Sequence, residues 1–98
     1  MTPTTHQNMM KPPTHPTPEE LYANITRVLM LLGVSKDSIS PSAYFYQDLK
    51  LSRFDKNLLL TSLEFRFNII IPEAVTSQLI NMKRTVEYIV TADSKSIL

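Results

Sequence analysis

The sequence predicts an all-α fold, a four-helix bundle of three longer helices and one short helix with a long first loop. Apolar residues recur at helical spacing in three segments, 18–32, 53–67 and 83–91. Proline, glycine and serine interrupt the chain between these segments, where a helix cannot easily continue. The only β-branched run is short and has no second run with which to pair. We therefore expect an up-and-down bundle with a long crossover between its first two helices.

Composition excludes several classes of function. The 98 residues suffice for one domain, and a net charge of +1 gives no strong field for nucleic acid or an anionic membrane. The absence of cysteine excludes zinc–thiolate sites, iron–sulfur clusters and a cysteine nucleophile. A single glycine excludes the phosphate-binding loops of nucleotide-binding proteins. No stretch has the about 20 apolar residues of a membrane span, and none resembles a secretory signal, so we expect a cytoplasmic protein.

The chain divides into three parts by composition. Residues 1–17 are rich in proline and threonine and lack an apolar period, which predicts a disordered tail. His6 and His15 lie in this tail, and two histidines are too few for a closed zinc site, so no metal site is predicted. Residues 18–91 form the predicted helical domain, and 92–98 a flexible C-terminus.

The first helix has clear start and stop signals. Thr17, Pro18 and Glu20 stand in the order of a capping box with proline at the first helical position. Gly33 follows the last apolar residue and can adopt the positive φ that ends a helix. The long connection over 33–52 also contains apolar residues, and we expect these to turn inward as anchors. They are Val34, Ile39, Tyr44, Phe45 and Leu49.

The second helix, predicted over 53–67, has apolar residues on two opposite faces. The inner face consists of Leu59, Leu60, Leu63 and Phe67, and the outer face of Phe54, Leu58, Thr61 and Phe65. An ordinary surface helix has a single apolar face. The outer face therefore either contacts a partner or is covered by the long loop with Tyr44 and Tyr46.

The last third of the chain is predicted to complete the bundle. Three isoleucines before Pro72 favour an extended, buried connector. A short helix is expected over 73–80, through Val75 and Leu79. The last helix, over 83–91, is expected to turn Val86, Ile89 and Val90 inward, with Tyr88 near the rim.

From Gly33 to Ile89 the chain resembles the acyl carrier proteins, small four-helix carriers of fatty-acid, polyketide and related synthesis. The resemblance includes the end of the first helix, the loop anchors, the second helix and the final stretch. Its residues are Leu32, Gly33, Val34, Ile39, Phe45, Asp48, Leu49, Asp55, Leu59, Leu60, Leu63, Glu64, Phe67, Ile71, Pro72, Leu79, Val86, Glu87, Tyr88 and Ile89. This likeness implies a four-helix carrier fold.

The chain departs from that family at the motif that holds its prosthetic group. The family motif reads Asp-Leu-Gly-any-Asp-Ser-Leu, and its serine bears 4′-phosphopantetheine. The matching stretch begins at Asp48 and places Lys50 at the glycine, Ser52 at the aspartate and Arg53 at the serine. Arginine cannot form the phosphodiester, which implies that no prosthetic group is present. The alternative is attachment to Ser52, whose other interpretation is a helix N-cap.

A second departure concerns docking. Family members usually present an acidic second helix to their enzymes, whereas Leu58 and Phe65 occupy outward positions here. Set apart from Lys11, the chain has nine basic and nine acidic residues, so steering by charge is weak. Partner binding is therefore predicted at Arg53, Phe54, Leu58, Thr61 and Phe65.

No catalytic group is predicted, because no carboxylate pair has a base or a metal cluster beside it. Lys50, Arg53 and Lys56 are interpreted as a solvated rim, with phosphate contact at the helix N-terminus as the alternative. The sequence thus predicts a non-catalytic, acyl-carrier-like module that docks on synthase-type enzymes or other proteins. The alternatives are a functional acyl or peptidyl carrier with 4′-phosphopantetheine on Ser52, and a homodimeric structural protein.

Overall fold

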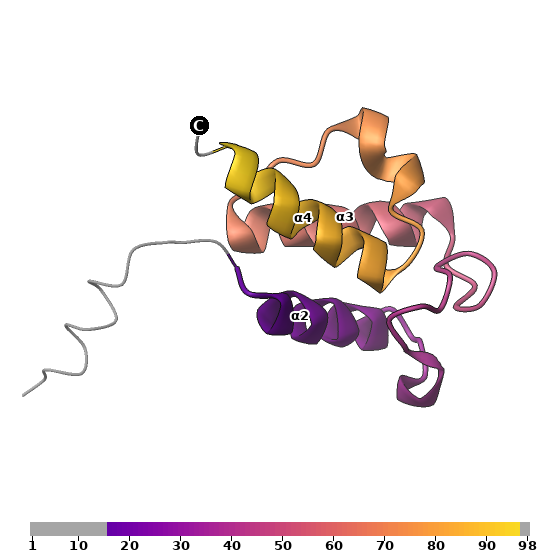
Figure 1. Cartoon of the computed structure of the whole chain (residues 1–98). Coiled ribbons are helices and arrows are strands. Elements are labelled where there is room, and N and C mark those ends of the chain that lie inside the picture. The colour runs from indigo at the N-terminus through magenta and orange to yellow at the C-terminus, as the bar shows by residue number, and fades with distance from the viewer. Residues whose placement is uncertain (1–15, 97–98) are drawn as a thin grey trace, which may run out of the picture.

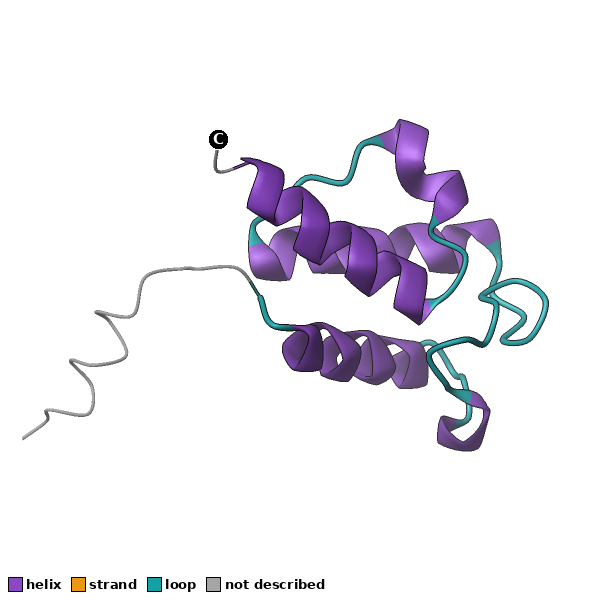
Figure 2. Cartoon of the chain, in the orientation of Figure 1, coloured by secondary structure: helices purple, strands orange, loops and turns teal. Residues whose placement is uncertain are grey.

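The computed structural model describes residues 16–96 of the chain. Its elements are α2 (Pro18–Leu31), η1 (Lys36–Ser38), α3 (Arg53–Phe67), η2 (Glu73–Gln78) and α4 (Met82–Ser96), where η marks a short 3-10 helix. The described residues form helices and loops without a regular strand, as Figure 2 shows, so the predicted all-α bundle is confirmed. The tail histidines His6 and His15 lie outside the described residues.

The three α-helices enclose one core. α2 lies along one side and packs against both α3 and α4 (Figure 1). α3 and α4 run in the same direction, antiparallel to α2. With the short helix η2 on the segment between α3 and α4, this is the predicted up-and-down order. The connection that contains η2 returns the chain along the length of α3 before α4 begins.

The buried core matches the predicted inner faces with few exceptions. Leu59, Leu60 and Leu63 of α3 are buried, and so are Val86 and Ile89 of α4. The full set of buried apolar residues is Leu21, Ile25, Leu29, Phe45, Leu49, Leu51, Leu59, Leu60, Leu63, Ile71, Leu79, Met82, Val86 and Ile89. Side chains from all three α-helices and from both connections therefore meet in a single core.

Two expected inward residues are exposed instead. Tyr44 belongs to the long loop and is 42% exposed, because its backbone bridges to Asn81 and its side chain points away from that of the next residue, Phe45, which enters the core. Ile70, in the middle of the isoleucine run, is 82% exposed. The alternation of an extended chain turns Ile70 outward when Ile71 points inward.

The α-helix α2 begins and ends as its sequence signals predict. Thr17 and Glu20 form the expected capping box, with the Glu20 N–H 3.1 Å from Thr17 Oγ1. Gly33 has a φ of +99°, and the Val34 N–H donates to the Leu29 carbonyl across it. Asn68, at φ +56°, ends α3 in the same left-handed conformation. Pro16, which precedes the first cap, is buried rather than part of a free tail.

The last two elements differ in detail from the prediction. η2 is a 3-10 helix that stops at Gln78, not an α-helix to residue 80. α4 continues to Ser96, past the predicted end at 91 and into the segment expected to be flexible. No proline, glycine or capping residue interrupts the chain between Thr91 and Ser96, so nothing local ends the helix. Of the described helices, none combines the length and apolar content needed to cross a bilayer.

Candidate functional site

Ser52 immediately precedes α3 and caps it. Its Oγ accepts a hydrogen bond from the Asp55 N–H at 3.0 Å, and its own N–H donates to Asp55 Oδ2 at 3.2 Å. The two bonds satisfy backbone donors that a helix start otherwise leaves without a partner. The N-cap interpretation of Ser52 is therefore confirmed. The sequence analysis overlooked that Asp55, three residues on, completes a capping box.

The gap-free register with the family motif agrees with the backbone. Lys50, which replaces the motif glycine, has a φ of +58°, in the left-handed region that glycine adopts without strain. Arg53, which replaces the motif serine, is the first residue of α3 and is exposed. The chain thus has a left-handed residue where the motif has its glycine, although Lys50, Ser52 and Arg53 replace the glycine, aspartate and serine of the motif.

The side chains at this helix start can be compared with what 4′-phosphopantetheine requires. The group needs a hydroxyl at the motif position, and the guanidinium of Arg53 offers none. The nearest hydroxyl, on Ser52, is one residue earlier and accepts the capping hydrogen bond. The residues present therefore do not fit the group at the family's attachment position.

The outer face of α3 is open to solvent. Phe54 is 69% exposed, Leu58 43% and Phe65 91%, and Thr61 between them is also exposed. The alternative in which the long loop covers this face is wrong for the described residues, because Tyr44 and Tyr46 lie beside a cavity on another side of α3. A helix that is apolar on both sides is here buried on only one.

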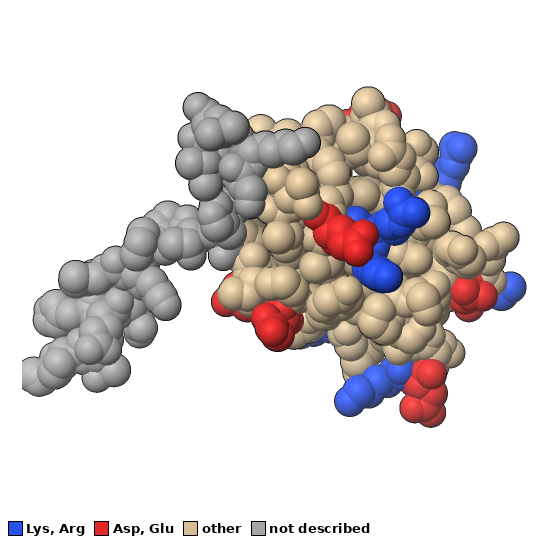
Figure 3. Space-filling model, in the orientation of Figure 1, with Lys and Arg blue, Asp and Glu red and all other residues tan. Residues whose placement is uncertain are grey.

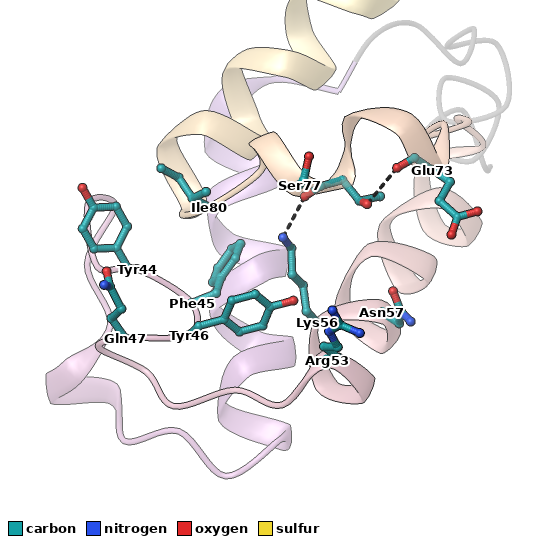
Figure 4. A pocket seen from close by; sticks show the side chains of 11 residues that line it. Tyr44, Phe45, Tyr46, Gln47, Arg53, Lys56, Asn57, Glu73, Ser77 and Ile80 are labelled. Carbon is teal, nitrogen blue, oxygen red and sulfur yellow. Dashed lines mark hydrogen bonds between the residues drawn. The ribbon is translucent and has the colours of Figure 1, made fainter.

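That cavity, of about 700 Å³, lies between the loop of residues 44–47, the first turns of α3, and η2 (Figure 4). We call it the loop–α3 cavity. Its walls include the aromatic residues Tyr44, Phe45 and Tyr46 and the charged residues Arg53, Lys56 and Glu73.

Lys56 contradicts its predicted place in a solvated rim. It is only 5% exposed, its Nζ donates to the Thr76 carbonyl at 2.7 Å, and Nζ lies 5.1 Å from the centre of the Tyr46 ring. Burial lowers the pKa of its ammonium below the ordinary value of 10.5. The signal was present in the sequence, since Lys56 precedes Leu59, Leu60 and Leu63 at the spacing of the inner face.

Charges of both signs are scattered over the surface. On the face seen in Figure 3, lysines and arginines lie among aspartates and glutamates, and neither sign forms a continuous patch. The resemblance implies an acidic second helix, whereas the outer face of α3 is apolar in the described chain. Arg53 and Arg66, near its two ends, are basic.

Three curated proteins, each named acyl carrier protein, are similar to this chain, and no protein-family model matches it. The protein from Cyanidioschyzon merolae is 34% identical over 58 residues, 59% of this chain and 64% of its own length. Those from Cyanidium caldarium and Guillardia theta are 28% and 29% identical, over 76% and 72% of this chain and 87% and 89% of their own lengths. The chain thus spans less than two thirds of the first of these relatives.

The described residues form a small bundle of three α-helices and two short 3-10 helices. The three proteins show that the chain is similar to acyl carrier proteins, the family that its sequence resembles.

Proposed function

We propose that the protein is a non-catalytic module with the acyl-carrier fold, which docks on a partner protein through the outer face of α3 and bears no prosthetic group. The observation that supports the proposal most is the first turn of α3. Arg53 occupies the attachment position, and the Ser52 hydroxyl caps the helix. The cytoplasmic location expected from the sequence belongs to the same proposal.

The outer face of α3 supports the docking part of the proposal. Its two phenylalanines and one leucine lie on one side of a helix and are exposed to water. A phenylalanine side chain buries about 150–250 Å². At about 25 cal/mol per Å², burial of these three side chains contributes several kcal/mol to binding. The partner is expected to be a synthase-type enzyme or another protein with an apolar groove.

Intact mass spectrometry tests the absence of the prosthetic group. The full chain is incubated with coenzyme A and a phosphopantetheinyl transferase of broad specificity, with an ordinary acyl carrier protein as the positive control. We expect no mass gain, because Arg53 has no hydroxyl. A stoichiometric adduct that disappears in Ser52→Ala would establish the alternative, a functional carrier of acyl or peptidyl chains with Ser52 as its anchor.

A homodimer through the same outer face is the other alternative. Sedimentation velocity over a range of protein concentrations distinguishes it from a module that binds a different protein. We expect a monomer, since the exposed face is one helix wide. Concentration-dependent dimerisation that is lost in a Leu58→Glu, Phe65→Glu double variant would favour the structural protein.

A further inference from the structure

The loop–α3 cavity contains a buried cation without a matching anion. Within residues 16–96, Lys56 has no carboxylate at ion-pair distance, and its contacts are the Thr76 carbonyl at 2.7 Å and the Tyr46 ring at 5.1 Å. An ammonium has three N–H donors, of which the carbonyl accepts one. A buried charge is costly unless it is paired and hydrogen-bonded. An anion that enters the cavity would supply the opposite charge and the hydrogen-bond acceptors that Lys56 lacks, and both would favour its binding.

A second cation lines the same cavity. Arg53 precedes Lys56 by three residues on α3, and both side chains belong to the cavity wall. The planar guanidinium matches the two oxygens of a carboxylate or phosphate. Glu73, the acidic residue of the lining, comes from η2, and Figure 4 shows its carboxylate turned away from Lys56. The part of the cavity around Lys56 is therefore positive.

The rest of the lining is suited to a flat apolar body. Tyr44, Phe45 and Tyr46 come from one loop, and Ile80 lies beside them after η2, where its carbonyl accepts the Phe45 N–H. Aromatic rings favour offset or edge contacts with another ring. A volume of about 700 Å³ lies within the range of about 300–1,000 Å³ typical of small-molecule sites, which combine apolar walls with a few polar groups.

We infer that the loop–α3 cavity binds a small aromatic oxyanion, a carboxylate or phosphate group on a flat ring. Lys56 and Arg53 hold the oxyanion, and Tyr44 and Tyr46 contact the ring. This site faces another side of α3 from Phe54, Leu58 and Phe65. The inference therefore does not depend on the proposed docking of a partner protein.

Titration of the ¹⁵N-labelled full chain, followed by NMR, tests the site with four probes. Benzoate and phenyl phosphate carry both the ring and the charge, benzyl alcohol only the ring, and inorganic phosphate only the charge. We expect saturable shifts around residues 44–47, Lys56 and Thr76 with one or both aromatic anions, and the stronger of these identifies the oxyanion. Binding of benzyl alcohol or inorganic phosphate as tight as that of the aromatic anions would overturn the inference, as would no saturable shift at all.

Three variants test whether the positive charges of the cavity bind the anion. Lys56→Met keeps a long apolar side chain and is expected to weaken binding of the aromatic anion by about tenfold, the effect of one charge-assisted hydrogen bond. Arg53 is exposed, so Arg53→Met leaves the core intact and should weaken binding of the aromatic anion several-fold. This variant tests the site even if Lys56→Met folds poorly. Lys83→Met removes an exposed positive charge from α4 and should bind as the wild type does. Equal losses in all three variants would show attraction by net charge and overturn the site.

Discussion

Lys50 adopts a backbone conformation that a residue with a Cβ adopts only at a cost. Its φ of +58° lies in the left-handed region, where a non-glycine residue loses about 1–2 kcal/mol. Leu51 is buried in the core, and Ser52 caps α3. These two neighbours fix the backbone on one side of Lys50, so Lys50 has to adopt the left-handed conformation. The strain is therefore local to Lys50.

Lys50→Gly should raise the stability of the protein. Relief of the left-handed strain is partly offset by the greater freedom of glycine in the unfolded chain, and the expected net gain is about 0.5–1 kcal/mol. Urea denaturation of the two proteins measures the difference. Gly33→Ala is the matched opposite change, since Gly33 has a φ of +99°, and it should be destabilising. A loss of stability in Lys50→Gly would contradict the assigned strain.

The buried ammonium of Lys56 should make stability depend on pH in the alkaline range. Its pKa in the folded protein is lowered, so the unfolded chain holds the proton more tightly. Between the lowered pKa and the ordinary value of 10.5, stability therefore rises with pH, and the cost of the charge is present in full at lower pH. Denaturant unfolding measured across this range should show that rise relative to Lys56→Met. Parallel curves for the two proteins would mean that the amine is solvated.

At the scale of elements, α3 has two apolar faces that differ in burial. Leu63 is fully buried, whereas Leu58 and Phe65 are exposed on the other side of the same helix. Leu63→Ala should cost about 2–5 kcal/mol of folding free energy, as expected for a cavity in a packed core. The double change Leu58→Glu and Phe65→Glu should cost little stability and should abolish partner binding. Paired denaturant melts and a pull-down with wild-type and double-variant bait measure the two effects; equal destabilisation would place the outer face in the core.

The bounds of α2 and α3 were predictable because their signals are local. Thr17 and Ser52 cap the helices, and Gly33 supplies the positive φ at the end of α2. Asn68 plays the same part for α3, and the sequence analysis overlooked it, since asparagine is a rarer signal there than glycine. The helical period of the apolar residues predicted the buried faces. Lys56 also falls on this period, but its positive charge led to its assignment to the solvated rim.

The path of the long loop was not predictable from local signals. The sequence places Tyr44 and Phe45 next to each other, and both were expected inside. Distant bonds decide between them: the Phe45 N–H donates to the Ile80 carbonyl, and Tyr44 pairs with Asn81. The position of η2 likewise depends on distant contacts, which no residue period encodes. The loop–α3 cavity, which both segments line, could therefore be found only in the structure.

Across the whole molecule, the first loop and the start of the last helix are joined by backbone hydrogen bonds. The Phe45 N–H lies 2.9 Å from the Ile80 carbonyl oxygen, and the Lys83 N–H lies 3.0 Å from that of Pro41. Contacts between residues so far apart in sequence form late in folding, because a long stretch of chain must be ordered first. If either segment moves away from the core, both segments lose these backbone hydrogen bonds.

Amide hydrogen exchange should therefore report the two segments as one opening unit. In native-state exchange followed by NMR, the Phe45 and Lys83 amides are expected to have matching opening free energies, although they belong to different elements. The Gly33 amide, bonded within its own helix end to the Met30 carbonyl, should open independently of them. A ligand or partner that draws the loop outward would expose the first turn of α4 to solvent in the same event, so a signal at the first loop reaches the start of the last helix.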